Sequence, residues 1–292
     1  FFMNVHKYYR SMECKNIDFV FTLYPGGGFR LNSVETDNKL KNIFDSKNFK
    51  GVIVNQHHVK NYLIHKKLCN SDKITLIPGV PVNLENKNLE GENDKFDKDL
   101  KLLFFGNKYT KNGQDKGFDT FVLVALSLID KLDNVSFHVI GGFSEEDLNE
   151  VNLKKSFTFY GKLNESSYSK ILAFTQIIIS ANKPFILNSN AFDGFPLATC
   201  VEASLYDNLI MATDYFNESN EIGLKNNIDF IKISSNIEDI TSIILSLNKN
   251  RDRLKQISIS GKKKVLNLYS YENQILPRFR FFNNIINQKC YL

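Results

Sequence analysis

The stretch AFDGFPLATCVEASLY, residues 191–206, joins a polar loop to an amphipathic helix, and the expected fold is built around it. Proline is favoured in the first turn of a helix, where its missing N–H leaves no hydrogen bond unmade, so we expect a helix to begin near Pro196. The unpaired N–H groups of that turn and the positive end of the helix dipole favour a bound phosphate. Gly194 lets the backbone approach such a ligand closely.

Glu202 lies about one and a half turns into that helix, where its carboxylate suits the hydroxyl groups of a ribose. The stretch therefore indicates a nucleotide, with its diphosphate at the helix start and its ribose at Glu202. The alternative is a D-G-F-P turn that only begins a helix, because such turns are common between elements.

Apolar runs and helical patterns alternate along the rest of the chain, which predicts parallel sheets covered by helices in Rossmann-like layers. A polar, charged segment divides the alternation into two parts. In the first part we expect strands at 17–24, 51–54 and 74–77 and helices at 37–44 and 59–68. In the second part we expect strands at 101–105, 135–140, 156–159, 177–180, 208–213 and 229–233, and helices at 117–132, 166–174, 238–247, 251–268 and 271–286.

Glycine-containing loops follow several of the expected strands. Pro25 and the glycines Gly26 to Gly28 follow the first strand, Gly106 follows the strand at 101–105, and Gly142 follows the strand at 135–140. Ligands of parallel sheets bind at the carboxyl ends of the strands, and glycine allows the backbone to approach them. These loops are therefore candidate ligand-binding segments, although glycine-rich loops also occur without such a role.

The loop 107–116, NKYTKNGQDK, carries three lysines between a strand and the helix that Gly117 opens. Cations in this place can stabilise the charge that develops on a departing diphosphate. We therefore take Lys116 and Lys108 as candidate phosphate ligands. The alternative is a solvated loop.

Two motifs together resemble the donor domain of GT-B glycosyltransferases of the retaining, family-4 type. Asp193 and Glu202 flank a G-F-P run, as two acids flank G-F-x-x-x in that family, and Lys116 with Gly117 matches its K-G element. The commonest form of the motif has seven residues between the acids and begins with Glu, whereas eight residues separate them here. Lys108 stands in for the usual arginine.

The resemblance implies roles for individual residues. Lys116, Asp193 and Glu202 would be catalytic, with Lys116 on the diphosphate, Glu202 on the ribose and Asp193 facing the donor sugar. The loop at 160–163 would receive the nucleobase. The donor-binding residues would be Gly106, Lys108, Gly142, Leu163, Gly194, Phe195, Pro196 and Leu197.

The segment from Thr22 to Asn83 resembles the second half of the acceptor domain of the same enzymes, whose first half we do not find. The implied fold class is α/β and GT-B-like, with two Rossmann-like domains of which the first is partial and the site in the cleft between them. Many relatives carry a catalytic histidine where this chain has Tyr24 or Pro25, so no such histidine is transferred. The expected parts are a partial acceptor-side domain at 1–83, a linker at 84–99, a nucleotide-sugar domain at 100–270 and a helix at 271–292 that returns to the first domain.

The implied reaction is transfer of a sugar from a nucleoside diphosphate sugar, the donor substrate, to a glycan, lipid-linked or protein acceptor, as in polysaccharide biosynthesis. The family retains the anomeric configuration and uses neither metal nor cofactor, and the sequence has no DxD-type metal motif. The main alternative is a non-catalytic module of the same fold that binds a nucleotide sugar or a protein partner. Use of Asp193 and Glu202 as a glycosidase acid pair, or an epimerase or phosphorylase activity, is disfavoured.

Length and composition limit the number of domains and the compartment that we expect for the protein. The 292 residues, 42% of them hydrophobic, suffice for one large domain or two moderate ones. The four cysteines form no CxxC or Cys/His cluster, which argues against zinc and disulfides and favours a reducing cytoplasm. We expect neither a membrane span nor a signal peptide.

Residues 1–88 carry a net charge of +6 and the remainder −1, so the first part could contact anionic lipid headgroups or a phosphorylated acceptor. Without a nucleic-acid motif, we expect no nucleic-acid partner.

Overall fold

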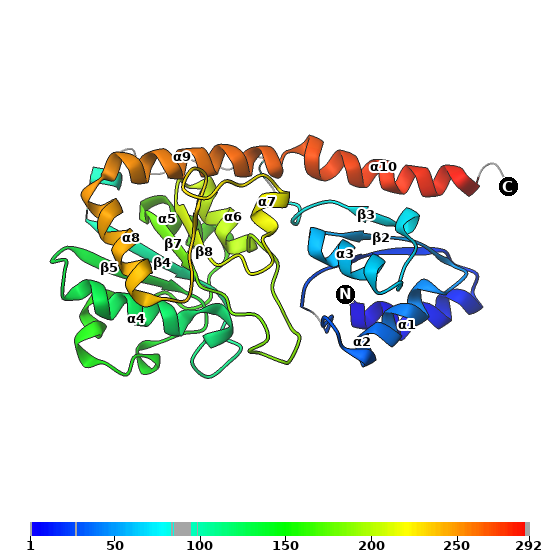
Figure 1. The fold of residues 1–292 in the computed structure, drawn as a ribbon, viewed down its shortest axis with the longest axis horizontal. Coiled ribbons are helices and arrows are strands. Elements are labelled where there is room, and N and C mark those ends of the chain that lie inside the picture. Colours follow the sequence, from blue (N-terminus) through cyan, green and yellow to red (C-terminus); the bar gives the residue numbers. More distant parts are fainter. Residues whose placement is uncertain (1, 27, 83, 85–94, 98, 290–292) are drawn as a thin grey trace. The chain divides into compact units, whose positions relative to one another are not determined.

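The computed structural model describes residues 2–26, 28–82, 84, 95–97 and 99–289. The chain forms two compact units, each with its own parallel sheet (Figure 1). Unit 1 consists of Phe1–Leu84, Asn188–Phe195 and Asn267–Leu292, and unit 2 of Glu85–Leu187 and Pro196–Leu266. Most of the linker that we predicted at 84–99, namely 85–94 and 98, lies outside the described residues.

Unit 2 is built on a six-stranded parallel sheet with the strand order β6-β5-β4-β7-β8-β9. The long connections between its parallel strands contain helices, as parallel pairing requires. The strands are β4 (Leu100–Phe105), β5 (Val135–Ile140), β6 (Phe157–Phe159), β7 (Ile177–Ser180), β8 (Leu209–Ala212) and β9 (Ile231–Lys232). The helices are α4 (Phe118–Ile129), α5 (Glu165–Phe174), α6 (Ala198–Leu205), α7 (Glu218–Glu221), α8 (Ile237–Lys249) and α9 (Arg251–Leu268).

Helices cover both faces of the unit 2 sheet, because side chains alternate in direction along each strand. Leu102 and Phe104 of β4 join the core cluster that includes the buried side chains of α4 and α8. Phe105 points to the other face, where its ring lies 5.2 Å from that of Tyr168 on α5. Buried on both faces, the central strands are nearly continuous apolar runs, as parallel strands with two covered faces are.

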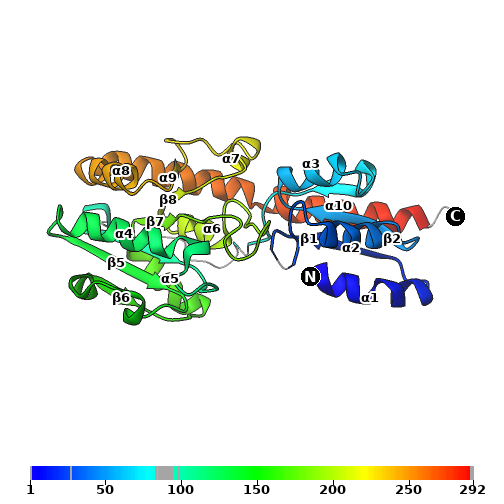
Figure 2. The same ribbon diagram turned by 60° about the horizontal axis from the view of Figure 1, so that its bottom comes forward.

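Unit 1 has a three-stranded parallel sheet in the order β1-β2-β3. Phe281 of the last helix packs with Ile53 and Ile77 on one face of this sheet, and Phe21 stacks on Phe44 on the other. Figure 2 shows the helices around this sheet from a second direction. The elements are α1 (Phe2–Cys14), β1 (Phe19–Leu23), α2 (Val34–Phe44), β2 (Phe49–Val54), α3 (His57–His65), β3 (Ile74–Leu76) and α10 (Tyr271–Lys289).

The predicted order of strands and helices is confirmed, but one boundary in the central stretch is wrong. Helix α6 begins at Ala198 and not near Pro196, because Leu197 has an extended backbone with φ −64° and ψ 151°. Pro196 therefore precedes the helix. The short helix α7 was not predicted. Among the described residues, no helix combines the length and apolar character needed to cross a membrane.

Candidate functional site

The candidate site in unit 2 is the edge of the sheet where parallel strands β4, β5 and β7 end. Gly106 follows β4 and donates its N–H to the carbonyl of Ile140 over 3.0 Å, and Gly141 donates to the carbonyl of Gly161 over 2.9 Å. A Cβ on Gly141 would lie 1.9 Å from the carbonyl oxygen of Gly106. Gly141 also has φ +142°, so a side chain is excluded by both conformation and space. Glycine at this position lets the two loops meet.

Side-chain carbons of three lysines lie beside Gly106 and Gly142. An added Cβ on Gly106 would lie 3.7 Å from the Cβ of Lys116. One on Gly142 would lie 3.6 Å from the Cε of Lys162 and 3.8 Å from the Cβ of Lys108. Lys108 and Lys116 come from the loop after β4 and Lys162 from the loop after β6, so two loops place lysines beside the backbone of Gly106 and Gly142. Such an arrangement can bind an anionic group by charge and by hydrogen bonds.

The position of Lys116 is fixed by the turn that carries it. Lys116 ends the 3₁₀ turn Gln114–Lys116 and is followed by Gly117, which has φ +75°. A Cβ on Gly117 would lie 2.2 Å from the carbonyl oxygen of Ala181, the residue after β7. The K-G pair therefore lies against the end of the neighbouring strand. The Lys116 ammonium lies 5.5 Å from the centre of the Tyr109 ring.

Lys108 is engaged by an acid in the structure. Its ammonium forms an ion pair with the carboxylate of Asp147, and it lies 5.8 Å from the centre of the Phe143 ring. Asp147 also accepts a hydrogen bond from the backbone N–H of Ser144, over 3.0 Å. A phosphate at this edge would compete with Asp147 for Lys108.

Helix α6 begins at the same edge of the sheet. Cys200 in its first turn lies at Ser180, the last residue of β7, and burial raises the pKa of the Cys200 thiol to about 11 although Ser180 opposes the shift. Leu197 is the N-cap and Glu202 is the half-buried fifth helical residue. Pro196, Leu197 and Glu202 therefore belong to unit 2, with the glycines and lysines.

Leu163 lies in the loop between β6 and α5 and is half-buried. Gly161 in this loop has φ +67°, and Asn164 caps α5 by accepting a hydrogen bond from the N–H of Ser167 over 3.0 Å. The loop is thus held at both ends, with Lys162 and Leu163 between. Lys162 was not among the predicted site residues, and only the loop position after a strand could have indicated it.

The other three predicted residues, Asp193, Gly194 and Phe195, belong to unit 1. The side-chain amide of Gln56 accepts from the N–H of Phe195 and donates to its carbonyl, both over 3.1 Å. Phe192 packs edge-on against the rings of Phe29 and His58 at 5.6 and 5.1 Å. The central stretch is therefore divided between the units at the bond from Phe195 to Pro196. Whether Asp193 faces a donor sugar stays a prediction.

The loop after β1 is described only in part, because Gly27 lies outside the described residues. Gly26 and Phe29 form an isolated bridge, and the Phe29 ring is fully buried. His57 and His58 open α3 and are half-buried.

His138 on β5 is a buried residue of the core. Its ring nitrogens lie 3.0 Å from the Ser136 hydroxyl and 2.9 Å from the Tyr160 hydroxyl. Burial, with the charge of Lys101, lowers the pKa of His138 to about 4. In the part of the chain that the structure describes, no three His, Cys, Asp or Glu side chains are grouped so that they could hold a metal ion.

Comparison with solved structures shows the fold. The chain is similar to a variant of S. aureus TarM in complex with fondaparinux, α-GlcNAc-glycerol and UDP, with 16% identity and a TM-score of 0.72 over 95% of this chain and 54% of that one. It is similar to sucrose-phosphate synthase of Thermosynechococcus elongatus, with 14% identity and a TM-score of 0.71 over 96% and 71%. Anabaena HepE in complex with UDP-glucose matches with 12% identity and a TM-score of 0.66 over 97% and 75%.

The chain spans about half the length of TarM. No protein-family model and no curated protein sequence matches it. These structural neighbours are GT-B glycosyltransferases, and the mixed α/β architecture with parallel sheets seen here is that of GT-B folds.

Proposed function

We propose that this chain is a glycosyltransferase that uses a nucleoside diphosphate sugar as donor. The observation that carries the proposal is the gathering of Lys108, Lys116 and Lys162 around Gly106 and Gly142 at the carboxyl edge of the unit 2 sheet. Parallel α/β sheets bind ligands at this edge. The likeness of the fold to GT-B glycosyltransferases supports the same reading.

The lysines act on the charge of the leaving group. During transfer the bond between the anomeric carbon and the diphosphate oxygen breaks, and its electron pair stays with the diphosphate. Lys116 and Lys162 offset that charge, and Lys108 joins them when it leaves Asp147. The N–H groups at the start of α6 add partial positive charge. Because these groups already supply positive charge, we propose that the donor binds without a metal.

The order of the loops suggests where the ribose and the nucleobase of the donor bind. Glu202 would accept hydrogen bonds from the ribose hydroxyls, and the loop with Leu163 would receive the nucleobase. Retention of the anomeric configuration and a glycan, lipid-linked or protein acceptor complete the proposal. TarM and HepE, which were solved with UDP or UDP-glucose, suggest a uridine nucleotide as the first donor to try.

The proposal is tested in two steps with the whole chain. Thermal-shift screening of UDP, GDP, ADP and CMP sugars identifies a bound donor, because a ligand that binds only the folded state raises the melting temperature. The donor that binds is then incubated with candidate acceptors, and release of the nucleotide is followed. Binding together with acceptor-dependent release supports the transferase. Binding with no release under any acceptor would favour a module that binds without turnover, and no binding at all would contradict both.

A further inference from the structure

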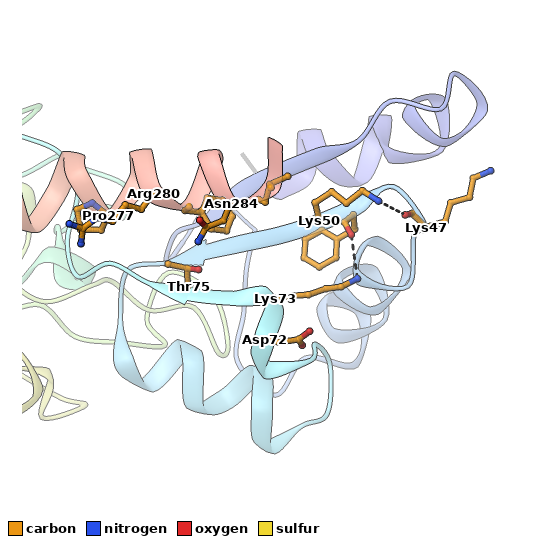
Figure 3. A pocket seen from close by; sticks show the side chains of 11 residues that line it. Lys47, Lys50, Asp72, Lys73, Thr75, Pro277, Arg280 and Asn284 are labelled. Atoms are coloured by element: carbon orange, nitrogen blue, oxygen red, sulfur yellow. Dashed lines mark hydrogen bonds between the residues drawn. The ribbon is translucent and has the colours of Figure 1, made fainter. Parts of the chain in front are cut away.

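A pocket of about 550 Å³ lies in unit 1 between α10 and the sheet, and we call it the α10 pocket. Figure 3 shows its polar side chains, which come from β2 and the turn before it, from the 3₁₀ turn Ser71–Lys73, from β3 and from α10. Lys50 comes from β2, Thr75 from β3 with Lys73 just before it, and Arg280 and Asn284 from α10. The volume is within the range of small-molecule sites, about 300–1,000 Å³.

The α10 pocket lies at the amino ends of the strands. Lys50 is the second residue of β2, and Lys73 immediately precedes β3. The opposite edge of this sheet is where β1 leads to Tyr24 and β2 leads to Gln56. Within unit 1 the pocket is therefore distinct from the loops that hold residues 192–195, and all of its lining residues belong to unit 1.

The cations of the pocket are only weakly engaged. The Lys50 ammonium lies 3.4 Å from the carbonyl of Lys47 and 3.5 Å from the carboxylate of Asp18, and the Lys73 ammonium lies 3.4 Å from the carbonyl of Phe49. Typical N–H···O distances are about 2.7–3.2 Å, so these contacts are long. Among the described residues Arg280 has no hydrogen bond or ion pair, and Asp72 is the one acid that lines the pocket.

The walls of the pocket are fixed by packing. A Cβ on Gly51 would lie 3.0 Å from the Phe281 ring, so glycine at this position is what allows α10 to approach β2 closely. Phe281 is buried against Ile53 and Ile77. The Lys73 ammonium lies 5.3 Å from the centre of the Phe49 ring, a cation–π distance. Packing therefore fixes a frame whose lining has four cations, Lys47, Lys50, Lys73 and Arg280, and one acid, Asp72.

We propose that the α10 pocket binds a ligand that carries phosphate groups. The guanidinium of Arg280 matches a phosphate with two parallel hydrogen bonds, and Lys50 and Lys73 add point charges with donors to spare. Asn284 and Thr75 offer neutral hydrogen bonds beside them. The ligand is either a soluble phosphate ester or the headgroup of an anionic phospholipid, since both present the same chemistry. The proposal does not depend on the proposed donor site.

The test uses the full chain and inorganic pyrophosphate in calorimetry, in a Lys116→Gln background that weakens the unit 2 lysine site. The double variant Lys73→Gln with Arg280→Gln removes two pocket cations and is expected to lower the affinity at least tenfold, about 1.4 kcal/mol. The control, Lys15→Gln with Lys41→Gln, removes two exposed charges elsewhere in unit 1 and should change the affinity less than threefold. Asn284→Asp, which adds a negative charge to the pocket, should act in the same direction as the double variant.

Equal affinities in the pocket and control variants would overturn the proposal, as would the absence of any pyrophosphate binding in the Lys116→Gln background. Flotation with phosphatidylcholine vesicles, with and without phosphatidic acid, identifies the source. Pocket-dependent flotation only with phosphatidic acid assigns the site to a lipid headgroup. Pyrophosphate binding without such flotation assigns it to a soluble phosphate ester.

Discussion

The side chain of Gln56 pairs with the main chain of Phe195 as a neighbouring strand would, accepting from its N–H and donating to its carbonyl, both over 3.1 Å. Gln56 is 2% exposed and Phe195 is buried, so water cannot replace these bonds. A Cβ on Gly194 would lie 3.1 Å from the Gln56 amide nitrogen. This pairing ties the residues just before α6 to unit 1.

Replacing Gln56 by Glu keeps the acceptor for the Phe195 N–H but faces the Phe195 carbonyl with an oxygen instead of a donor. We expect a loss of about 1–3 kcal/mol in the free energy of unfolding, the usual cost of an unsatisfied buried polar group. Hydrogen exchange should quicken at 188–195. Gln114→Glu, at an exposed position of the lysine loop, is the control. Unchanged exchange at 188–195 in the Gln56 variant would show that other contacts hold this segment.

Asp147→Asn should raise the affinity for a nucleoside diphosphate, because it frees Lys108 from its ion pair. Partly exposed ion pairs are worth about 0.2–1 kcal/mol, so the gain should be at most about fivefold. In a Lys108→Ala background the same change should give no gain. Calorimetry on the four proteins completes the cycle. An equal gain in both backgrounds would mean that Asp147 acts on the ligand without Lys108.

Glu202→Gln should weaken binding of the ribonucleotide and leave binding of its 2′,3′-dideoxy counterpart nearly unchanged, because only the first has a diol to bond. We expect a loss of about tenfold, the lower range for a charged hydrogen bond. Glu202 also lies in the early part of α6, where a negative charge interacts favourably with the helix dipole, so the substitution is expected to lower the melting temperature independently of ligand binding. Comparison of the two ligands cancels that effect. Equal losses for both would make Glu202 a structural residue.

Because His138 is buried, we predict that it makes the free energy of unfolding depend on pH. Its pKa is lowered to about 4 in the folded protein, by burial and then by Lys101, against an ordinary value of about 6.5. The unfolded chain therefore binds the extra proton first, so this contribution is complete above pH 6.5 and is lost as the pH falls to 4. The loss is at most about 3 kcal/mol. Urea unfolding should show that the free energy of unfolding falls less steeply between pH 6.5 and 4 in His138→Asn than in the wild type. An equally steep fall in both proteins would refute the assignment.

The strands of unit 2 could be predicted closely because their physical signal is local. Val135–Ile140 and Ile177–Ser180 are apolar runs bounded by polar residues, and both have the predicted ends. The start of α6 could not be predicted from the sequence, because Pro196 suits either a first helical turn or the extended segment that precedes a helix. Its extended neighbour Leu197 decided the outcome.

The candidate site was predictable only where each residue follows a strand. Lys116 and Gly106 meet at one edge because both flank elements of a parallel sheet. Lys162 lies beside Gly142, and no spacing along the chain indicates that contact. The pairing of Gln56 with Phe195 spans 139 positions, so it depends on tertiary structure alone.

The central claim is that the lysines at the carboxyl edge of the unit 2 sheet bind a diphosphate without metal. Calorimetry in EDTA with a nucleoside diphosphate and with the bare nucleoside tests it most directly, in the wild type, in Lys116→Ala and in Lys111→Ala as a control from the same loop. We predict that Lys116→Ala lowers the diphosphate affinity by about ten- to a hundredfold, the value of a charged hydrogen bond of about 1.5–3 kcal/mol, and leaves the nucleoside affinity unchanged. Equal losses for both ligands, or binding that requires magnesium or manganese, would contradict the claim.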